Sequence, residues 1–339
     1  MSEGLRAGAA KPGSRQDVRA MYEAFPYPSP LAGGSLIEDI ANCVQSLFGD
    51  DQLIGKRILD AGCGTGHRLA AVARRYPEAH VTGVDMTAAS LEVARDLASA
   101  HDLRNVEFCQ SDLTSFEAAE PFDVIVSSGV LHHLENPGRG HEALARLLSS
   151  RGVLAVWHYH SLGEHQRLID RELILTMWKR ESGFDQGLQV MEALGLQLET
   201  KRYGSSASQA TEEVSQRSLD VDAYLHPIVN AYRFDEAIRM YRDCAHLEWA
   251  AVNNVNLVDR SKLLDLGGVE TGDLAYFCQR NEDLFADGDL RARFAALEPL
   301  QKLRVIEIKL KPTGFTIVGG RKDALDGLPQ RVRSNAVIL

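Results

Sequence analysis

The sequence lacks the long apolar runs and paired cysteines that mark several other classes of protein. No stretch of its 339 residues approaches the roughly 18–20 apolar residues of a membrane-spanning helix. The polar start, Met1 to Arg15, has no apolar segment typical of a secretory signal. The five cysteines occur singly, without a CxxC pair, so neither a zinc site nor a disulfide framework is expected. We therefore expect a cytoplasmic protein without a metal site.

Basic residues are also in deficit, and no cluster of them stands out along the chain. The 37 Lys and Arg residues are outnumbered by 47 Asp and Glu residues, which gives a formal net charge of −10. Proteins that bind nucleic acid usually carry a basic face that neutralises phosphates. We therefore expect no nucleic-acid or membrane partner, and the sequence does not indicate an oligomeric state.

Short apolar segments that alternate with amphipathic stretches run through the first half of the chain. Such alternation predicts an α/β fold, with parallel strands joined by right-handed helical crossovers in a doubly wound sheet. The expected strands are 57–61, 80–84, 106–110, 122–127 and 152–157.

The alternation of strands and helices is less regular elsewhere, and we divide the chain where this alternation begins and where it weakens. Residues 1–50 are expected to form a polar tail and a helical lid arm, and 51–160 the ligand-binding core. Residues 161–232 are expected to be an insertion that caps the strand ends, and 233–330 to complete the sheet with a further helical insertion. Late strands are predicted at 247–252 and in a hairpin, 305–310 and 315–318, around Pro312-Thr313-Gly314.

A glycine-rich turn follows the first predicted strand. Gly62, Gly64 and Gly66 allow unusual backbone angles and let a ligand approach the main chain, although turn glycines alone would give the same pattern. Asp60, just before them, would repel a phosphate but attract an ammonium group. Cys63 is interpreted as a small apolar filler. The turn therefore favours an amino-acid-bearing ligand over a dinucleotide.

Two further acidic residues end the next predicted strands. Asp85 lies about 20–25 residues beyond the glycines, where a carboxylate can accept hydrogen bonds from ribose hydroxyls. Met86 can pack on an adenine face. Asp112 can accept from the adenine amino group, or it can be a helix N-cap, and Leu113 can supply an apolar wall.

Residues 57–158 resemble the class I S-adenosylmethionine (SAM)-dependent methyltransferases. The resemblance rests on Asp60-Ala-Gly-Cys-Gly-Thr-Gly66, Val84-Asp85-Met86, Asp112-Leu113 and Ser127-Ser-Gly-Val-Leu-His-His-Leu134, in the family's order. It implies a mostly parallel, seven-stranded sheet and SAM as cofactor. It also implies that Asp60 and the glycines line the methionine part of SAM, and that Ser128 and Gly129 border its sulfonium. The segment 22–28 resembles a bacterial subgroup with a Tyr/Pro-rich arm.

Candidate catalytic residues lie in two places. His132 and His133 follow the fourth predicted strand, where a histidine can act as a general base, although this run is also a structural element of the family. Tyr22 and Tyr27 could form a lid over a sulfonium cation, or could simply anchor the arm. A group further along the chain could line a pocket for the methyl acceptor: Tyr224, His226, Asn230 and Tyr232.

Three functions remain open at this stage. The first is methyl transfer to a small-molecule acceptor. The second is an intramolecular displacement on SAM by its own α-amine, which would release methylthioadenosine, as in enzymes that make azetidine-2-carboxylate. The third is SAM binding without catalysis.

Overall fold

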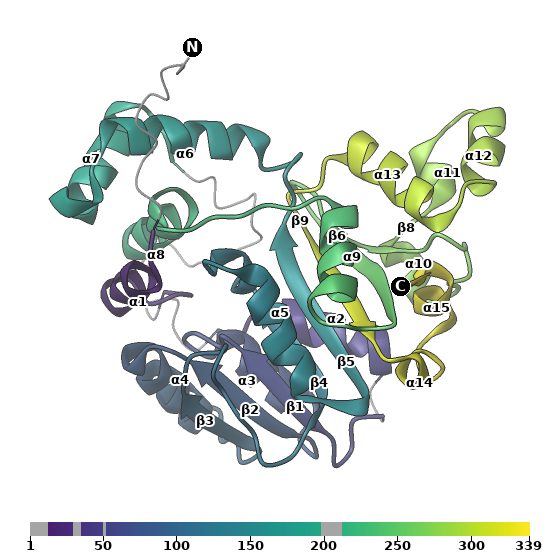
Figure 1. The fold of residues 1–339 in the computed structure, drawn as a ribbon, viewed down its shortest axis with the longest axis horizontal. Helices are drawn as coiled ribbons and strands as arrows, with labels where there is room; N and C mark the ends of the chain where they lie inside the picture. The colour runs from purple at the N-terminus through teal and green to yellow at the C-terminus, as the bar shows by residue number, and fades with distance from the viewer. Residues whose placement is uncertain (1–12, 30–34, 50–51, 198–211) are drawn as a thin grey trace, which may run out of the picture.

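A single twisted sheet forms the centre of the molecule (Figure 1). The computed structural model describes residues 13–29, 35–49, 52–197 and 212–339, so most of the polar tail expected at the N-terminus lies outside the described residues. The strand order is β3-β2-β1-β4-β5-β9-β6-β7-β8, with β10 paired to β6. The first five of these strands run parallel: β3 (Val106–Gln110), β2 (His80–Asp85), β1 (Arg57–Ala61), β4 (Phe122–Ser128) and β5 (Leu148–Tyr159).

The far side of the sheet is mixed. β9 (Gly314–Gly320) lies antiparallel between β5 and β6 (Trp249–Asn256). The predicted α/β, doubly wound fold is confirmed, but the predicted count of seven strands is too low. Three short strands extend the sheet beyond the expected seven: β7 (Ser261–Leu264), β8 (Cys278–Gln279) and β10 (Val337–Ile338).

Helices cover both faces of the sheet because its strands are apolar on both sides. Ile58 and Val124 pack into a cluster with the helices of one face, while their neighbours Leu59 and Ile125 pack with those of the other. The first face carries α2 (Asp39–Phe48), α3 (His67–Arg75), α4 (Ala88–Ala100), α14 (Lys322–Leu325) and α15 (Gln330–Asn335). The opposite face carries α5 (Pro137–Arg146), α9 (Phe234–Asp243) and α13 (Pro299–Leu310).

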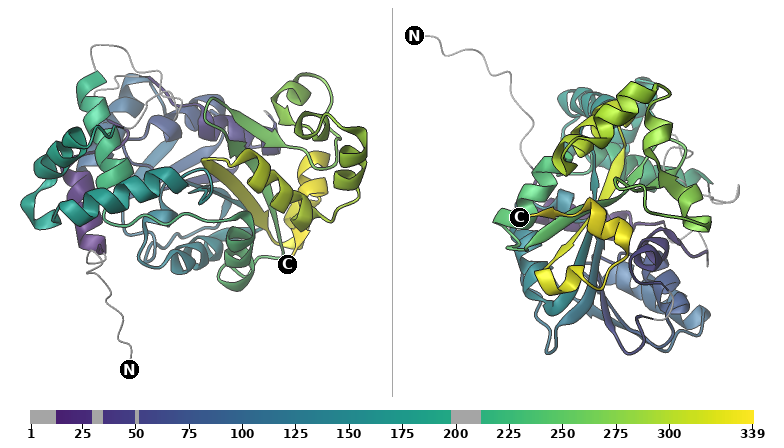
Figure 2. Two further views of the ribbon diagram at one scale, coloured as in Figure 1. Left: turned by 90° about the horizontal axis from the view of Figure 1, so that it is seen from above. Right: turned by 90° about the vertical axis from the view of Figure 1, so that its right-hand side faces the viewer.

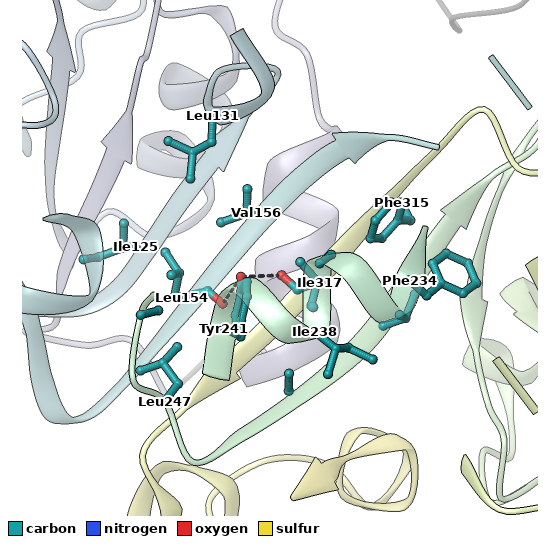
Figure 3. Close-up of a cluster of buried hydrophobic side chains, with 14 of the residues drawn as sticks. Ile125, Leu131, Leu154, Val156, Phe234, Ile238, Tyr241, Leu247, Phe315 and Ile317 are labelled. Atoms are coloured by element: carbon teal, nitrogen blue, oxygen red, sulfur yellow. Dashed lines mark hydrogen bonds between the residues drawn. The ribbon is translucent and has the colours of Figure 1, made fainter. Parts of the chain in front are cut away.

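Helix α9 shows how the helices of this opposite face are held against the sheet (Figure 3). Phe234, Ile238 and Tyr241 point from one side of this helix toward β5 and β9. The Tyr241 hydroxyl lies 3.0 Å from the carbonyl oxygen of Ile317 and 3.3 Å from that of Leu154. The buried phenol is therefore satisfied at the seam between two strands, as a buried polar group requires.

A separate group of helices lies beyond the carboxyl ends of the parallel strands (Figures 1 and 2). We call it the cap; it consists of α1 (Arg15–Ala24), α6 (His165–Met177), η3 (Arg180–Ser182), α7 (Phe184–Ala193), α8 (Glu212–Asp220) and the π-helical turn η6 (Val221–Leu225). The cap has its own apolar core, which includes Met21, Ile174, Trp178, Met191 and Leu225. Segments far apart in sequence are therefore held together by packing that does not involve the sheet.

The predicted hairpin around Pro312 is wrong in its first half. Residues that were expected to form a strand at 305–310 belong to α13, which begins with Pro299 and a capping box between Glu298 and Gln301. The alternating apolar residues there also fit a helical period, and the helix buries Leu303 and Ile306 three residues apart. The remaining helices are α10 (Asp273–Phe277), α11 (Asn281–Leu284) and α12 (Gly288–Ala295), together with the 3-10 turn η2 (Leu131–His133).

None of the helices in the described residues is both long enough and apolar enough to cross a membrane.

Candidate functional site

A cavity of about 460 Å³ opens between the strand ends and the cap. Its volume lies within the range of roughly 300–1,000 Å³ typical of small-molecule sites. Asp60, Asp85 and Ser128 come from the last residues of β1, β2 and β4, and Asp112 follows β3. The carboxyl ends of parallel strands meet at one edge of the sheet, where ligands of this fold class bind. The topology thus brings the predicted acids together.

The glycine turn leaves room that no other residue would leave. Gly62 and Gly64 have φ angles of +85° and +52°. A Cβ on Gly64 would lie 2.3 Å from the Tyr27 carbonyl oxygen, and one on Gly62 would lie 2.4 Å from Val130 Cγ2. Both glycines line the cavity. Gly66 does not line it; this residue precedes α3, and its φ of +78° ends the turn.

Asp85 braces the glycine turn from the next strand. Its carboxylate accepts hydrogen bonds from the Gly64 amide at 3.0 Å and from the Thr87 amide and hydroxyl at 2.9 and 2.8 Å. Burial raises the pKa of Asp85, against the lowering effect of these hydrogen bonds. Two carboxylate oxygens offer about four acceptor positions, so the side chain can accept one further donor.

Asp60 has no comparable partners. It is 3% exposed and lines the cavity, and no hydrogen bond to its carboxylate is found within the described residues. Burial raises the pKa of Asp60 to about 7, although the Arg68 charge acts in the opposite direction. A buried acid without compensation is stabilised by a cation placed beside it. The site therefore suits a positively charged ligand group.

Asp112 is tied both to its own loop and to the cap. Its carboxylate accepts from the Thr114 amide at 2.8 Å, and also pairs with Arg15 of α1 at 2.8 Å. Burial alone would raise the pKa of Asp112, but the hydrogen bonds from Thr114 and the Arg15 charge together lower it. Met86 and Leu113 line the same end of the cavity. Sequence reasoning missed Arg15, which forms this ion pair across 97 residues.

Cys63 also lines the cavity, and its thiol is buried. Burial raises the pKa of this thiol well above its usual range, with Asp60 and Asp85 adding to the effect. A protonated thiol is a poor nucleophile, so Cys63 acts here as a small apolar wall.

The N-terminal arm closes directly on the glycine turn. The Thr65 hydroxyl donates to the Pro28 carbonyl oxygen at 2.8 Å, and the Thr65 amide donates to the Tyr27 carbonyl oxygen at 3.3 Å. Tyr22 and Tyr27 both line the cavity. The arm is thus part of the wall of the site.

His133 and His132 have different environments, although they are neighbours. His133 lines the cavity, and its Nδ1 lies 2.6 Å from the Ile228 carbonyl oxygen. Nδ1 must carry the proton to donate there, so Nε2 keeps its lone pair. Burial lowers the pKa of His133 to about 3, with Arg167 and Arg171 adding to the effect.

His132 is fully buried and does not line the cavity. Neither of its ring nitrogens has a hydrogen-bond partner in the described part of the chain, and burial lowers its pKa well below the usual range. Its aromatic neighbours include Tyr159, whose ring centroid is 4.4 Å away. This position fits a packing residue, and a catalytic role of His132 stays a prediction.

The structure adds Asp222, which sequence reasoning missed. The Tyr22 hydroxyl donates to Asp222 Oδ1 at 2.8 Å, and His226 stacks on His133 with ring centroids 3.7 Å apart. None of the predicted pocket residues Tyr224, His226, Asn230 and Tyr232 lines the cavity itself. No local motif marks Asp222, because its partner lies 200 residues away.

His133, Asp222 and His226 form a group of metal-ligand type. One potential ligand atom of each lies within 4.8 Å of the others. The Ile228 amide, however, donates to His226 Nδ1 at 3.0 Å, which places the proton of the neutral ring on Nε2. A histidine ligand needs the opposite arrangement, with its other ring nitrogen donating. The hydrogen bonds therefore favour a polar cluster over a cation site.

Comparisons with known proteins agree with this geometry. The family described as "Methyltransferase domain" matches residues 54–203. An uncharacterized protein of Synechococcus sp., syc1184_c, is 28% identical over 317 residues, which cover 88% of this chain and 70% of that protein. A malonyl-[acyl-carrier protein] O-methyltransferase of Halalkalibacterium halodurans is 26% identical over 223 residues, which cover 57% of this chain and 81% of that protein.

Among solved structures, PKMT2 from Rickettsia typhi in complex with S-adenosylhomocysteine (AdoHcy) superposes with a TM-score of 0.54 at 20% identity. The match covers 90% of this chain but only 56% of that one, and at this identity it shows the fold alone. SAM is the cofactor typical of the matched family. Residues 54–203 thus match the methyltransferase domain family, and the sheet has the fold of a solved structure that contains AdoHcy.

Proposed function

We propose that the cavity binds SAM at the strand ends and presents its methyl group to a small-molecule acceptor beneath the cap. One observation carries the proposal: a single cavity joins the acids of the strand ends to Tyr22, Tyr27 and His133. We call the part lined by Asp60, Asp85 and Asp112 the adenosyl end. The part lined by Tyr22, Tyr27 and His133 is the acceptor end.

The adenosyl end fits the parts of SAM one by one. Asp85 has one of its about four acceptor positions left for a ribose hydroxyl. Asp60 lacks a partner and would hold the ammonium of the methionine moiety. Gly62 and Gly64 leave backbone room where a Cβ would collide. Asp112, with Met86 and Leu113 as apolar walls, would take the adenine.

SAM supplies a methyl group that its sulfonium already activates. The chain has to align an acceptor with that methyl and keep water out. Ser128 and Gly129 border the middle of the cavity, and the arm covers it through Tyr27 and Pro28. The acceptor would lie against Tyr22 and His133.

The acceptor class is inferred from the lining and from the relatives. The relative from Halalkalibacterium is named for methylating a malonyl group on acyl-carrier protein. A cavity of about 460 Å³ that also holds SAM leaves space for a small group rather than for a folded macromolecule. A metabolite or a short acyl group is therefore the proposed acceptor.

The contact between the N-terminal arm and the glycine turn supports a second candidate function, an intramolecular reaction of SAM. The Pro28 carbonyl is bonded to Thr65, and the Tyr27 carbonyl packs on Gly64, so the arm lies against the turn that would hold the methionine moiety. A sealed site would favour attack by the α-amine of SAM itself, with release of methylthioadenosine. SAM binding without turnover is the third reading.

Incubation of the full chain with SAM, first alone and then with a metabolite extract, separates these functions. AdoHcy that forms only with the extract supports methyl transfer. Methylthioadenosine that forms with SAM alone supports the intramolecular reaction. Binding of AdoHcy in a calorimeter with neither product supports the non-catalytic reading.

A further inference from the structure

The acceptor end has a polar connection that leads away from the cavity into the cap. Tyr22 of α1 lines the cavity, and its hydroxyl donates to the buried Asp222 at 2.8 Å. Asp222 belongs to η6, a single π-helical turn. Such turns are rare and occur frequently at functional sites. A residue of the cavity wall is thus bonded through its hydroxyl to a buried carboxylate.

Two imidazoles hold this pair in place. His226 contacts the Tyr22 ring edge-on, with centroids 5.6 Å apart, and stacks on His133 at 3.7 Å. Ile228 fixes both rings, since its carbonyl oxygen accepts from His133 Nδ1 and its amide donates to His226 Nδ1. Tyr22, a residue of the cavity wall, is therefore packed against a rigid surface, and its hydroxyl is held by Asp222.

We propose that Tyr22 and Asp222 form a proton relay that deprotonates the acceptor during methyl transfer, and that the acceptor is a protic nucleophile such as a hydroxyl, phenol or amine. This inference rests on the proposed function. The acceptor's lone pair bonds to the methyl carbon, and the carbon–sulfur bond breaks with its electrons left on sulfur. The acceptor's proton passes to the Tyr22 oxygen as the Tyr22 proton passes to Asp222. The neutral acid then loses its proton to solvent after the products leave.

Neither tyrosine nor histidine could do this alone. Burial raises the pKa of Tyr22 well above its usual range, with Asp222 adding to the effect, so its hydroxyl stays protonated until a base behind it accepts the proton. The pKa of His133 is lowered to about 3 by burial and by nearby arginines, which makes this ring a hydrogen-bond acceptor rather than a base. In this relay His133 therefore has a positioning role, and its action as a general base stays the alternative prediction.

Asp222 is suited to accept the proton near neutral pH. Burial raises its pKa to about 6, while the hydrogen bond from Tyr22 and the charges of Arg167 and Arg68 lower it. These groups face it from α1, α6 and α3, and His133 and His226 lie within the same cluster. A general base works best when its pKa lies near the working pH. Asp222 is ionised above pH 6, so turnover falls as the pH drops below that value.

The test uses the full chain, SAM and a panel of alcohols, phenols, primary and secondary amines, with a tertiary amine and a thioether as aprotic members. The readout is AdoHcy formation by mass spectrometry. Asp222→Asn can still accept from Tyr22 but cannot take its proton. We expect this change to lower kcat by about 100-fold or more, with KM little changed. The fall of kcat below pH 6 should disappear, and Asp222→Glu should restore part of the activity.

Two controls separate the relay from folding and from cofactor binding. Asp220→Asn removes a carboxylate from the same segment, outside the cavity lining, and should leave kcat near wild type. AdoHcy affinity, measured by calorimetry, should stay within about threefold in every variant. Tyr22→Phe should match Asp222→Asn, and the double variant should be no slower than either single one, because the two residues act as a unit.

Two results would overturn the relay while leaving the methyltransferase proposal intact. One is Asp222→Asn with more than half of the wild-type kcat or an unchanged pH profile. The other is methylation of the aprotic members alone. A wild-type chain that binds AdoHcy but methylates no member of the panel would instead count against the proposed function, and with it the relay.

Discussion

The two ends of the cavity are built in different ways. The adenosyl end is carried by the last residues of neighbouring strands and by one glycine turn, all between residues 57 and 129. The acceptor end draws on Tyr22 and Asp222, from two distant segments of the cap that pack through its separate core, and on His133 of η2, which follows β4. The difference teaches that the proposed cofactor site is set by the sheet, whereas the proposed acceptor chemistry depends on how the cap is packed. Changes at the first end should act on AdoHcy affinity, and changes at the second on turnover.

The largest effect should come from Gly64→Ala. Its Cβ would lie 2.3 Å from the Tyr27 carbonyl oxygen, at a φ of +52°. Backbone strain of about 1–2 kcal/mol and a steric term of about 1–3 kcal/mol together predict roughly 300-fold weaker AdoHcy binding by calorimetry. Gly49→Ala is the matched control, since Gly49 has a φ of +66° with nothing within 4 Å. If both variants bind alike, contact between the arm and the turn does not shape the site.

Asp85→Ala should weaken AdoHcy binding by about 100-fold. Hydrogen bonds to a charged group contribute about 1.5–3 kcal/mol each, and the loss includes the brace on the Gly64 amide. Asp96→Ala, at an exposed position on α4, is the control and should change nothing. An Asp85→Ala variant with wild-type affinity would remove the ribose contact from the account.

The raised pKa of Asp60 predicts that the affinity for AdoHcy depends on pH. With its pKa raised to about 7 by burial, the side chain is ionised at pH 8 and mostly neutral at pH 6. The ammonium of AdoHcy prefers the ionised form, so affinity should fall about tenfold between these pH values. In Asp60→Asn the calorimetric affinity should be weaker and independent of pH in this range. A flat wild-type profile would contradict the prediction.

The raised pKa of Asp60 also affects folding, where the effect of pH has the opposite sign: the folded state becomes less stable as the pH rises. The folded pKa of Asp60 exceeds that of the unfolded chain, so the folded state binds the proton more tightly. The stability that this proton contributes is present at acid pH and is lost as the pH rises through 7. Asp60→Asn should therefore gain in Tm relative to the wild type at pH 8, and less at pH 5. A Tm difference that does not depend on pH would contradict the sign.

The smallest effect should come from the link between the two ends. Arg15 pairs with Asp112 at 2.8 Å, but its side chain is 62% exposed. Exposed ion pairs contribute about 0.2–1 kcal/mol, so Arg15→Ala should weaken AdoHcy binding by about two- to fivefold, and by less in high salt. Arg104→Ala breaks a more exposed pair with Asp102, away from the cavity, and is the control. Equal effects of the two changes would show that the Arg15 pair has no special role in the site.

The adenosyl end could be predicted from sequence because its signals are local. Asp60 and the glycines lie within one turn, and Asp85 and Asp112 follow short apolar strands whose parallel pairing places their ends together. The α/β class follows from the same alternation. The three added strands were missed because they are short: β8 and β10 have two residues each and β7 has four, too few to show a pattern.

The acceptor end could be predicted only in part. Tyr22 and His133 were singled out by motif, but Asp222 has no motif and reaches Tyr22 only through the packing of the cap. His132 was named with His133 because they are adjacent, yet a 3-10 turn points only one of them at the cavity. Residues 305–310 show the same limit, since their alternation fits both a strand and the helix that forms.

A crystal structure of the full chain with AdoHcy tests the central claim most directly. We predict a ribose hydroxyl on Asp85, the amino group beside Asp60, and the sulfur turned toward the space in front of Tyr22, with the Tyr22–Asp222 hydrogen bond retained. A nucleoside bound outside the strand ends, or a sulfur facing away from Tyr22, would contradict the account.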